Sequence, residues 1–131
     1  RAAQNKNSCA TLSELKNEKF SEPLYIRYLP WKIMTMVRHE KKGGKEIKCL
    51  SFFVQCNPES HSAWSCQATV VMKCLSYNPN VTAFTRQVKH VFTPRENDWG
   101  YSYFLPWSEL MDPKNEFVRD DSCLLEAHVK A

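Results

Sequence analysis

Apolar and polar residues alternate through most of this chain. Between Trp64 and Cys74 every even position is apolar, whereas the odd positions are mostly Ser, Gln, Thr or Lys. From Cys123 to Val129 the same alternation occurs, with the odd positions apolar. A period of two places alternate side chains on opposite faces of a β-strand. Both segments are therefore predicted to be strands with one buried face.

Other segments complete an all-β pattern. Strands are predicted at Leu24 to Arg38, at Phe84 to Phe92 and in the denser apolar run Leu50 to Gln55. Turn signals separate them, at Gly43-Gly44, Asn57-Pro58, Asn78-Pro79 and Asp112-Pro113. The one helical signal is a single turn at Trp107 to Met111, capped by Ser108. Strands with one apolar face must cover each other, which predicts a two-sheet antiparallel sandwich or a small barrel.

The chain divides into a weakly patterned start and one domain. Residues 1–20 are polar and are expected either to form an edge strand around Cys9 to Leu15 or to be a disordered lead-in. Residues 21–131 are expected to form a single domain, a length that can bury a full core. The chain starts at Arg1 without a leader, so we expect a fragment of a larger protein.

The charge pattern argues against nucleic-acid and membrane partners. The net charge is +4, and the densest basic run, Arg38 to Lys48, is centred on the predicted turn at Gly43-Gly44. A solvated hairpin is expected there, because phosphate binding needs many basic residues on one continuous face. No apolar run reaches the roughly 18 residues of a membrane span.

The six cysteines leave two interpretations open. Together with the glycosylation sequon at Asn80 they would suit a secreted, disulfide-linked sandwich. Several cysteines, however, share the parity of buried strand residues, where a free thiol packs as a small apolar group. This favours a reduced, intracellular protein. The cysteines lie at positions 9, 49, 56, 66, 74 and 123.

No motif for catalysis or metal binding is present in the sequence. Nucleophile elbows, phosphate-binding glycine loops and H-E-x-x-H are all missing, and the cysteine spacing does not fit zinc. No cofactor is predicted, and catalysis by one of the cysteines is the weakest alternative. The four histidines, His39, His61, His90 and His128, are interpreted as solvent-exposed strand residues.

Four segments together resemble a known family. "YIRYLPWKIM", "FFVQCN", "WSCQA" and "RENDWGYSYF" follow one another as in TRAF-like (MATH) domains, over roughly Pro23 to Ala131. They are most similar to the N-terminal substrate-binding domains of ubiquitin-specific proteases of the herpesvirus-associated type. The resemblance implies an eight-stranded antiparallel sandwich. It also implies that the domain is a monomer and that the protein is nuclear and cytoplasmic. Such a domain recruits substrates and regulators for a cysteine protease domain outside these residues.

The resemblance also implies a binding site. Family members capture extended peptides of the form Pro/Ala-x-x-Ser in a shallow groove. Asp98 would accept a hydrogen bond from the serine, Trp99 would contact the Pro or Ala, and Gly100 would keep the approach open. Arg27, in "YIRYLPW", would reach carbonyl or acidic groups of the peptide.

The sequence departs from the family at three positions of this site. Gln87, Lys89 and Tyr103 stand where an arginine, a serine and an asparagine are expected. Lys89 would favour acidic residues beside the core motif, and Tyr103 would either block contacts or supply its own hydroxyl. The flanking specificity is therefore left open.

Two further alternatives concern the family and the tryptophans. A MATH domain could also come from a ubiquitin-ligase substrate adaptor or from a receptor-tail adaptor, although residues 1–20 show no heptads for the coiled coil of the latter. Trp31, Trp64 and Trp107 are interpreted as core residues because each lies within or beside an apolar strand pattern. Without the resemblance, Trp99 would be an aromatic residue in a turn.

Overall fold

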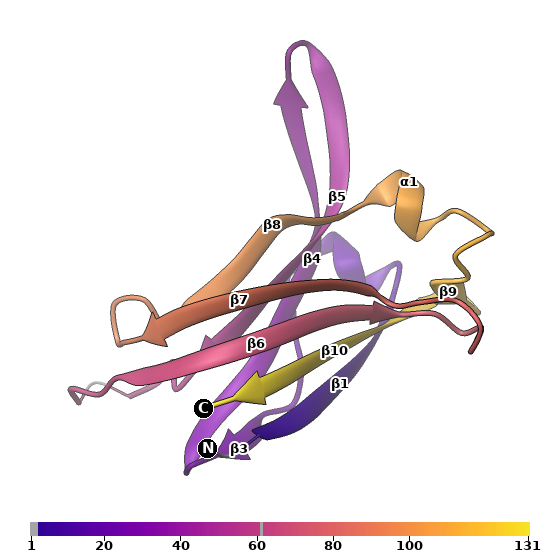
Figure 1. Ribbon diagram of the computed structural model, residues 1–131. Coiled ribbons are helices and arrows are strands. Elements are labelled where there is room, and N and C mark those ends of the chain that lie inside the picture. Colours follow the sequence, from indigo (N-terminus) through magenta and orange to yellow (C-terminus); the bar gives the residue numbers. More distant parts are fainter. Residues whose placement is uncertain (1–2, 61) are drawn as a thin grey trace.

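The computed structural model describes residues 3–60 and 62–131, which form a sandwich of two antiparallel sheets (Figure 1). Sheet A has the order β1-β10-β6-β7, with β9 paired to β10. Sheet B has the order β2-β4-β5-β8, with β3 paired to β4. The predicted fold class is confirmed. The described residues contain ten strands rather than eight: seven long strands, and the short strands β2, β3 and β9 of two or three residues each.

The elements have the following bounds. In sheet A the strands are β1 (Ala3–Thr11), β6 (Cys66–Leu75), β7 (Phe84–Phe92), β9 (Val118–Arg119) and β10 (Ser122–Lys130). In sheet B they are β2 (Lys19–Phe20), β3 (Leu24–Ile26), β4 (Leu29–Lys42), β5 (Lys45–Cys56) and β8 (Asp98–Pro106). A 3₁₀ turn, η1, covers Glu14–Lys16, and one helical turn, α1, covers Trp107–Leu110. No helix among these residues is long and apolar enough to cross a membrane.

The core fills the space between the two sheets. The predicted alternation of β6 and β10 is observed, since Ala68 to Cys74 and Cys123 to Val129 bury every second residue. Trp31 is fully buried and packs edge-on against Phe92. Trp64 and Trp107 are partly buried at its border, so all three tryptophans contact the core as expected.

Residues 3–16 are part of the sandwich. Strand β1 lies at the edge of sheet A and pairs with β10 from Ala3 opposite Lys130 to Thr11 opposite Ser122. The edge strand therefore begins and ends earlier than Cys9 to Leu15. Leu15, in η1, is fully buried in the core.

The segment predicted as one strand from Leu24 to Arg38 is broken. β3 and β4 form a hairpin whose two turn residues, Arg27 and Tyr28, have φ of 52° and 66°. Two positive φ values define a tight turn that usually carries Gly or Asn, so an Arg-Tyr pair gives no sequence signal. The predicted cap of the helical turn was also wrong, since Pro106 occupies the N-cap position and Ser108 lies inside α1.

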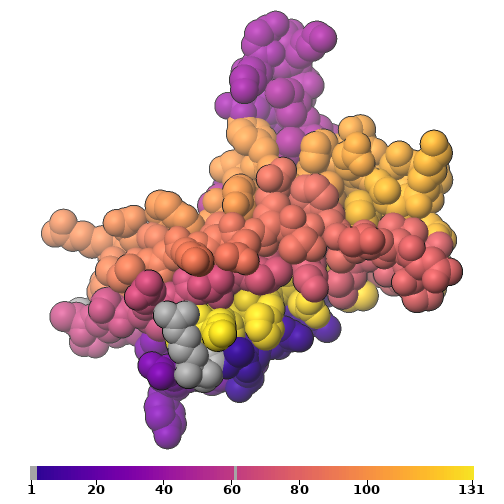
Figure 2. All heavy atoms as spheres, in the orientation of Figure 1, coloured from indigo at the N-terminus to yellow at the C-terminus, as the bar shows by residue number. Residues whose placement is uncertain are grey.

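The β4–β5 hairpin extends beyond the body of the sandwich (Figures 1 and 2). Residues 39–46 are exposed and include the Gly43-Gly44 turn, both with positive φ. The hairpin predicted for this basic run is therefore observed. We call residues 39–48 the arm.

Candidate functional site

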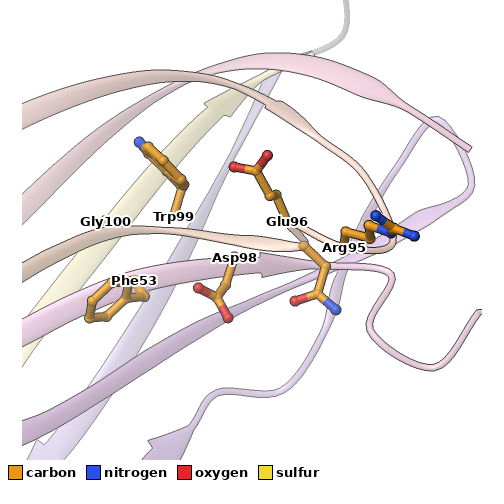
Figure 3. Close-up of a pocket in the computed structure, with 7 residues that line it drawn as sticks. Phe53, Arg95, Glu96, Asp98, Trp99 and Gly100 are labelled. Atoms are coloured by element: carbon orange, nitrogen blue, oxygen red, sulfur yellow. The ribbon is translucent and has the colours of Figure 1, made fainter.

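Asp98, Trp99 and Gly100 are the first three residues of β8, which is an edge strand of sheet B. They lie opposite Gln55, Val54 and Phe53 of β5. Val54 is buried, so the Trp99 side chain opposite it points to the inner face of sheet B, toward the core. Asp98 and Gly100 lie on the outer face with Phe53. Figure 3 shows the Trp99 and Asp98 side chains on opposite sides of the strand.

A pocket of about 350 Å³ surrounds this strand start (Figure 3). The three central residues of the predicted peptide site, Asp98, Trp99 and Gly100, all line this pocket. Four other residues complete its wall: Phe53, Arg95, Glu96 and Asn97. The pocket thus combines an apolar ring, a carboxylate and an exposed indole on one strand edge.

The backbone of β8 has an unpaired edge. The Cys56 N–H donates to the Asn97 carbonyl at 2.7 Å, so Asn97 and Cys56 form a hydrogen-bonded pair. Hydrogen-bonded and non-hydrogen-bonded pairs alternate along antiparallel strands, so Trp99 and Val54 form the next hydrogen-bonded pair. The backbone N–H and C=O groups of Asp98 and Gly100 therefore point away from β5. No described residue of β7 pairs with β8, so these groups are available to an additional strand.

Gly100 is required by the packing of β8 on β5. A Cβ atom at this position would lie 2.2 Å from the Phe52 carbonyl oxygen and 2.7 Å from the Phe53 Cα. Neither atom can move without shifting β5. The packing of β8 on β5 therefore requires a glycine at this position, whether or not a ligand binds.

The other predicted site residues lie outside this pocket. Arg27 is exposed in the β3–β4 turn, and Tyr103 is exposed farther along β8, beside Arg38 and Glu40. Gln87 and Lys89 occupy exposed positions of β7 that alternate with the buried Val88, which places them on the outer face of sheet A. The structure therefore brings together three of the seven residues.

His90 is a site residue that the sequence did not reveal. Its ring stacks on the Trp99 indole with centroids 3.9 Å apart and an interplanar angle of 8°. It is half-buried, so its interpretation as a solvent-exposed strand histidine was wrong. The same interpretation was wrong for His128, which is half-buried and contacts Asn5. His39 is exposed as expected and contacts Glu46, and His61 lies outside the described residues.

Arg38 is a second such residue. Its guanidinium carbon lies 5.8 Å from the centroid of the Phe53 ring, which lines the pocket. Its Nε is buried and has no hydrogen-bond partner among the described residues. The sequence placed Arg38 in a solvated basic run, and no local pattern distinguished it from the neighbouring lysines.

The cysteines are unpaired thiols, and burial keeps most of them protonated. Burial raises the pKa of Cys56 and of Cys123 to about 12 and raises the pKa of Cys49, Cys66 and Cys74. Thiols of this kind are poor nucleophiles, because the thiolate is the reactive form. Within residues 3–60 and 62–131, no group of three or more His, Cys, Asp or Glu is arranged to hold a metal ion.

Comparison with known proteins gives a consistent result. The family model described as MATH domain matches residues 6–129. Ubiquitin carboxyl-terminal hydrolase 7 of Drosophila melanogaster is 40% identical over 120 residues, which cover 90% of this chain and 10% of that protein. BTB and MATH domain-containing protein 38 of Caenorhabditis elegans is 33% identical over 113 residues, or 85% of this chain and 28% of that protein. The chain thus spans about a tenth to a quarter of the length of these relatives.

Proposed function

Because the chain belongs to the MATH domain family, we propose that it is a recognition domain that binds extended Pro/Ala-x-x-Ser peptides for a ubiquitin-specific protease. The observation that carries this proposal is the placement of Asp98 and Trp99 on opposite sides of one edge strand. In an extended peptide, residues three apart also point to opposite sides. The first and last residues of the motif match this geometry.

The peptide adds to β8 as a further strand. The free N–H and C=O groups of Asp98 and Gly100 form backbone hydrogen bonds with the peptide, and neighbouring side chains of β8 contact the peptide side chains and give specificity. With the serine opposite Asp98, only an antiparallel peptide brings its Pro or Ala next to Trp99. That residue then lies opposite Tyr101, on the same side of the strand as Trp99 and one diagonal step from it.

Each pocket residue has a role in this arrangement. The Asp98 carboxylate accepts the serine hydroxyl proton in a hydrogen bond, and the exposed indole of Trp99, 42% accessible, supplies a flat apolar surface for Pro or Ala. Gly100 lets β8 approach β5, and it leaves Phe53 uncovered beneath the peptide.

The flanking contacts come from residues beside the pocket. Residues before the Pro or Ala run along β8 toward Tyr103, and Arg38 lies next to Phe53 with an unsatisfied Nε. We assign to Arg38 the contact with peptide carbonyl or acidic groups that the sequence suggested for Arg27. Gln87 and Lys89 of the neighbouring strand β7 set a secondary preference, in which Lys89 favours acidic residues.

The parent protein is proposed to be a nuclear and cytoplasmic ubiquitin-specific cysteine protease whose catalytic domain lies outside these residues. The 40% identity with the fly hydrolase supports the protease part of this proposal, and the location is carried over from the family resemblance alone. A second candidate is the substrate-recognition domain of a BTB and MATH adaptor, which the 33% identity with the C. elegans protein favours. Both candidates use the domain as a monomeric peptide receptor.

Fluorescence anisotropy with a labelled Pro-x-x-Ser peptide tests the proposal. We expect saturable binding near micromolar affinity, weakened ten- to a hundredfold by Asp98→Asn and by a Ser→Ala peptide. This range follows because a hydrogen bond to a charged acceptor contributes about 1.5 to 3 kcal/mol. Trp99→Ala should also weaken binding, whereas Asp121→Asn, an exposed carboxylate between β9 and β10, should not. Equal binding by all four proteins would refute the assignment of the site.

A further inference from the structure

We propose that His90 is the positioning residue of the peptide groove, so that a Trp99–His90 pair, rather than Trp99 alone, forms the subsite for the Pro or Ala. This inference rests on the proposed peptide-binding function and adds a component to it. Three contacts of His90 support it, and each restrains a different part of the groove.

The first contact fixes the indole. Trp99 is attached to an edge strand and is 42% exposed, so its side chain would otherwise sample several rotamers. The His90 ring lies parallel to the indole at 3.9 Å, which covers one face of the indole and holds the plane. A preset side chain loses less conformational entropy on binding than a free one.

The second contact prevents His90 from moving away. Its ring meets the Phe92 ring edge-to-face at 4.7 Å and 85°, and Phe92 meets Trp31 in the same way at 4.9 Å and 80°. Phe92 and Trp31 are fully buried. The Trp99 indole of sheet B is thus linked to the core through His90 and Phe92 of sheet A and then Trp31 of sheet B.

The third contact fixes the neighbouring wall of the pocket. Nε2 of His90 lies 3.1 Å from the Glu96 carbonyl oxygen. Because a carbonyl only accepts, Nε2 carries the proton and donates. Glu96 also exchanges backbone hydrogen bonds with Thr93, at 3.1 and 3.2 Å, and lines the pocket beside Arg95 and Asn97. One side chain therefore holds both the indole and the loop before β8.

Two variants separate the contributions of His90, and a third is the matched control. His90→Phe keeps a flat ring and loses the donor, whereas His90→Gln keeps a donor near the Nε2 position and loses the ring. Ser76→Ala removes a different side-chain bond that holds a loop, the 2.7 Å hydrogen bond from the Ser76 hydroxyl to the Asn115 carbonyl, at a residue that does not line the pocket.

The experiment compares three peptides, Pro-x-x-Ser, Gly-x-x-Ser and Pro-x-x-Ala, by anisotropy with each protein. We expect the unaltered domain to prefer Pro over Gly about tenfold, since a partly buried apolar side chain contributes on that scale. His90→Gln should abolish the Pro/Gly preference while leaving the Ser/Ala preference within about twofold. His90→Phe should retain both preferences, and so should Ser76→Ala.

A retained Pro/Gly preference in His90→Gln would overturn the inference, as would equal loss of both preferences in Ser76→Ala and His90→Gln. If the unaltered domain binds none of the peptides, the proposed function fails separately. The positioning role is then decided by the indole ¹H–¹⁵N resonance of Trp99, assigned with Trp99→Phe. We expect this resonance to shift and broaden in His90→Gln and to stay sharp in His90→Phe, and an unchanged resonance in His90→Gln would refute the role.

Discussion

At the scale of single residues, the start of β8 combines packing constraints with exposed chemistry. Gly100 has no room for a methyl group, yet its neighbours Asp98 and Trp99 carry the polar and apolar groups of the pocket. The sequence motif Asp-Trp-Gly therefore has two physical origins. Gly100 meets the demands of the sheet, and the other two residues are available to a ligand.

Gly100→Ala should destabilise the domain by about 1 to 3 kcal/mol, because the new Cβ would overlap the β5 backbone. Urea denaturation followed by tryptophan fluorescence measures this change. Ser102→Ala on the same strand is the control and should stay within about 0.5 kcal/mol. Equal stabilities of the two variants would show that β8 has room to move away from β5.

Glu14 should titrate far below an ordinary glutamate. Its carboxylate accepts a 2.7 Å hydrogen bond from Lys19 and two 3.0 Å hydrogen bonds from Thr11, which lower its pKa from 4.5 to about 2. Because the folded pKa lies below the unfolded one, this contribution to stability is present above about pH 5 and is lost as the pH falls toward 2.

An NMR titration of the Glu14 side-chain carboxyl checks this prediction. The midpoint should lie near 2 in the unaltered domain and move toward 4.5 in Lys19→Met, which removes the largest cause of the shift. Lys16→Met, an exposed lysine on η1, should leave the midpoint in place. A midpoint near 4.5 in the unaltered domain would contradict the described ion pair.

At the scale of elements, periodicity predicted the long strands but not the details that build the site. β6 and β10 follow their period-two patterns because each has one face on the core. The β3–β4 turn escaped prediction because Arg27 and Tyr28 adopt positive φ without Gly or Asn. Ile26 pairs with Leu29 across this turn and is buried in the core, and that burial is a tertiary constraint that the local sequence does not show.

The candidate site was predictable only in part for a similar reason. Asp98, Trp99 and Gly100 are adjacent in sequence, and family resemblance identified them together. His90 of β7 stacks on Trp99, and the Arg38 guanidinium of β4 lies over the Phe53 ring, so each contacts a residue that lines the pocket. No local spacing connects these residues, so only the fold reveals their proximity.

The arm should be dispensable for folding. Residues 39–46 are exposed, and the 2.9 Å contact between the His39 ring and the Glu46 carboxylate is at the surface. Replacing residues 41–46 by Asn-Gly would join Glu40 to Ile47, a hydrogen-bonded pair of the β4–β5 ladder, by a two-residue hairpin turn. We expect the free energy of unfolding to change by less than about 1 kcal/mol, measured by urea denaturation. A larger loss would mean that the arm supports the sandwich.

At the scale of the whole molecule, the sandwich explains the six cysteines without disulfides. The thiols are unpaired, four of them are buried, and Cys9 is exposed on the edge strand β1. Burial raises the pKa of Cys56 and Cys123 to about 12, so these thiols react slowly in the folded domain.

Thiol titration with a chromogenic disulfide at pH 8 checks this description. We expect the folded domain to show a fast phase that Cys9→Ser removes, and the denatured, unreduced domain to show six thiols. Cys123→Ser should leave the fast phase unchanged. Fewer than six thiols after denaturation would support the disulfide-linked alternative.

The spacing of the ligand motif tests the central claim most directly. Asp98 and Trp99 lie on opposite sides of one edge strand, so the two recognised peptide residues must be an odd number of positions apart. Labelled peptides with Pro-x-Ser, Pro-x-x-Ser and Pro-x-x-x-Ser spacing should be titrated against the domain by anisotropy. We predict that the middle spacing binds at least tenfold more tightly than either neighbour. Equal affinities for all three spacings would show that the peptide is not read from the two sides of β8.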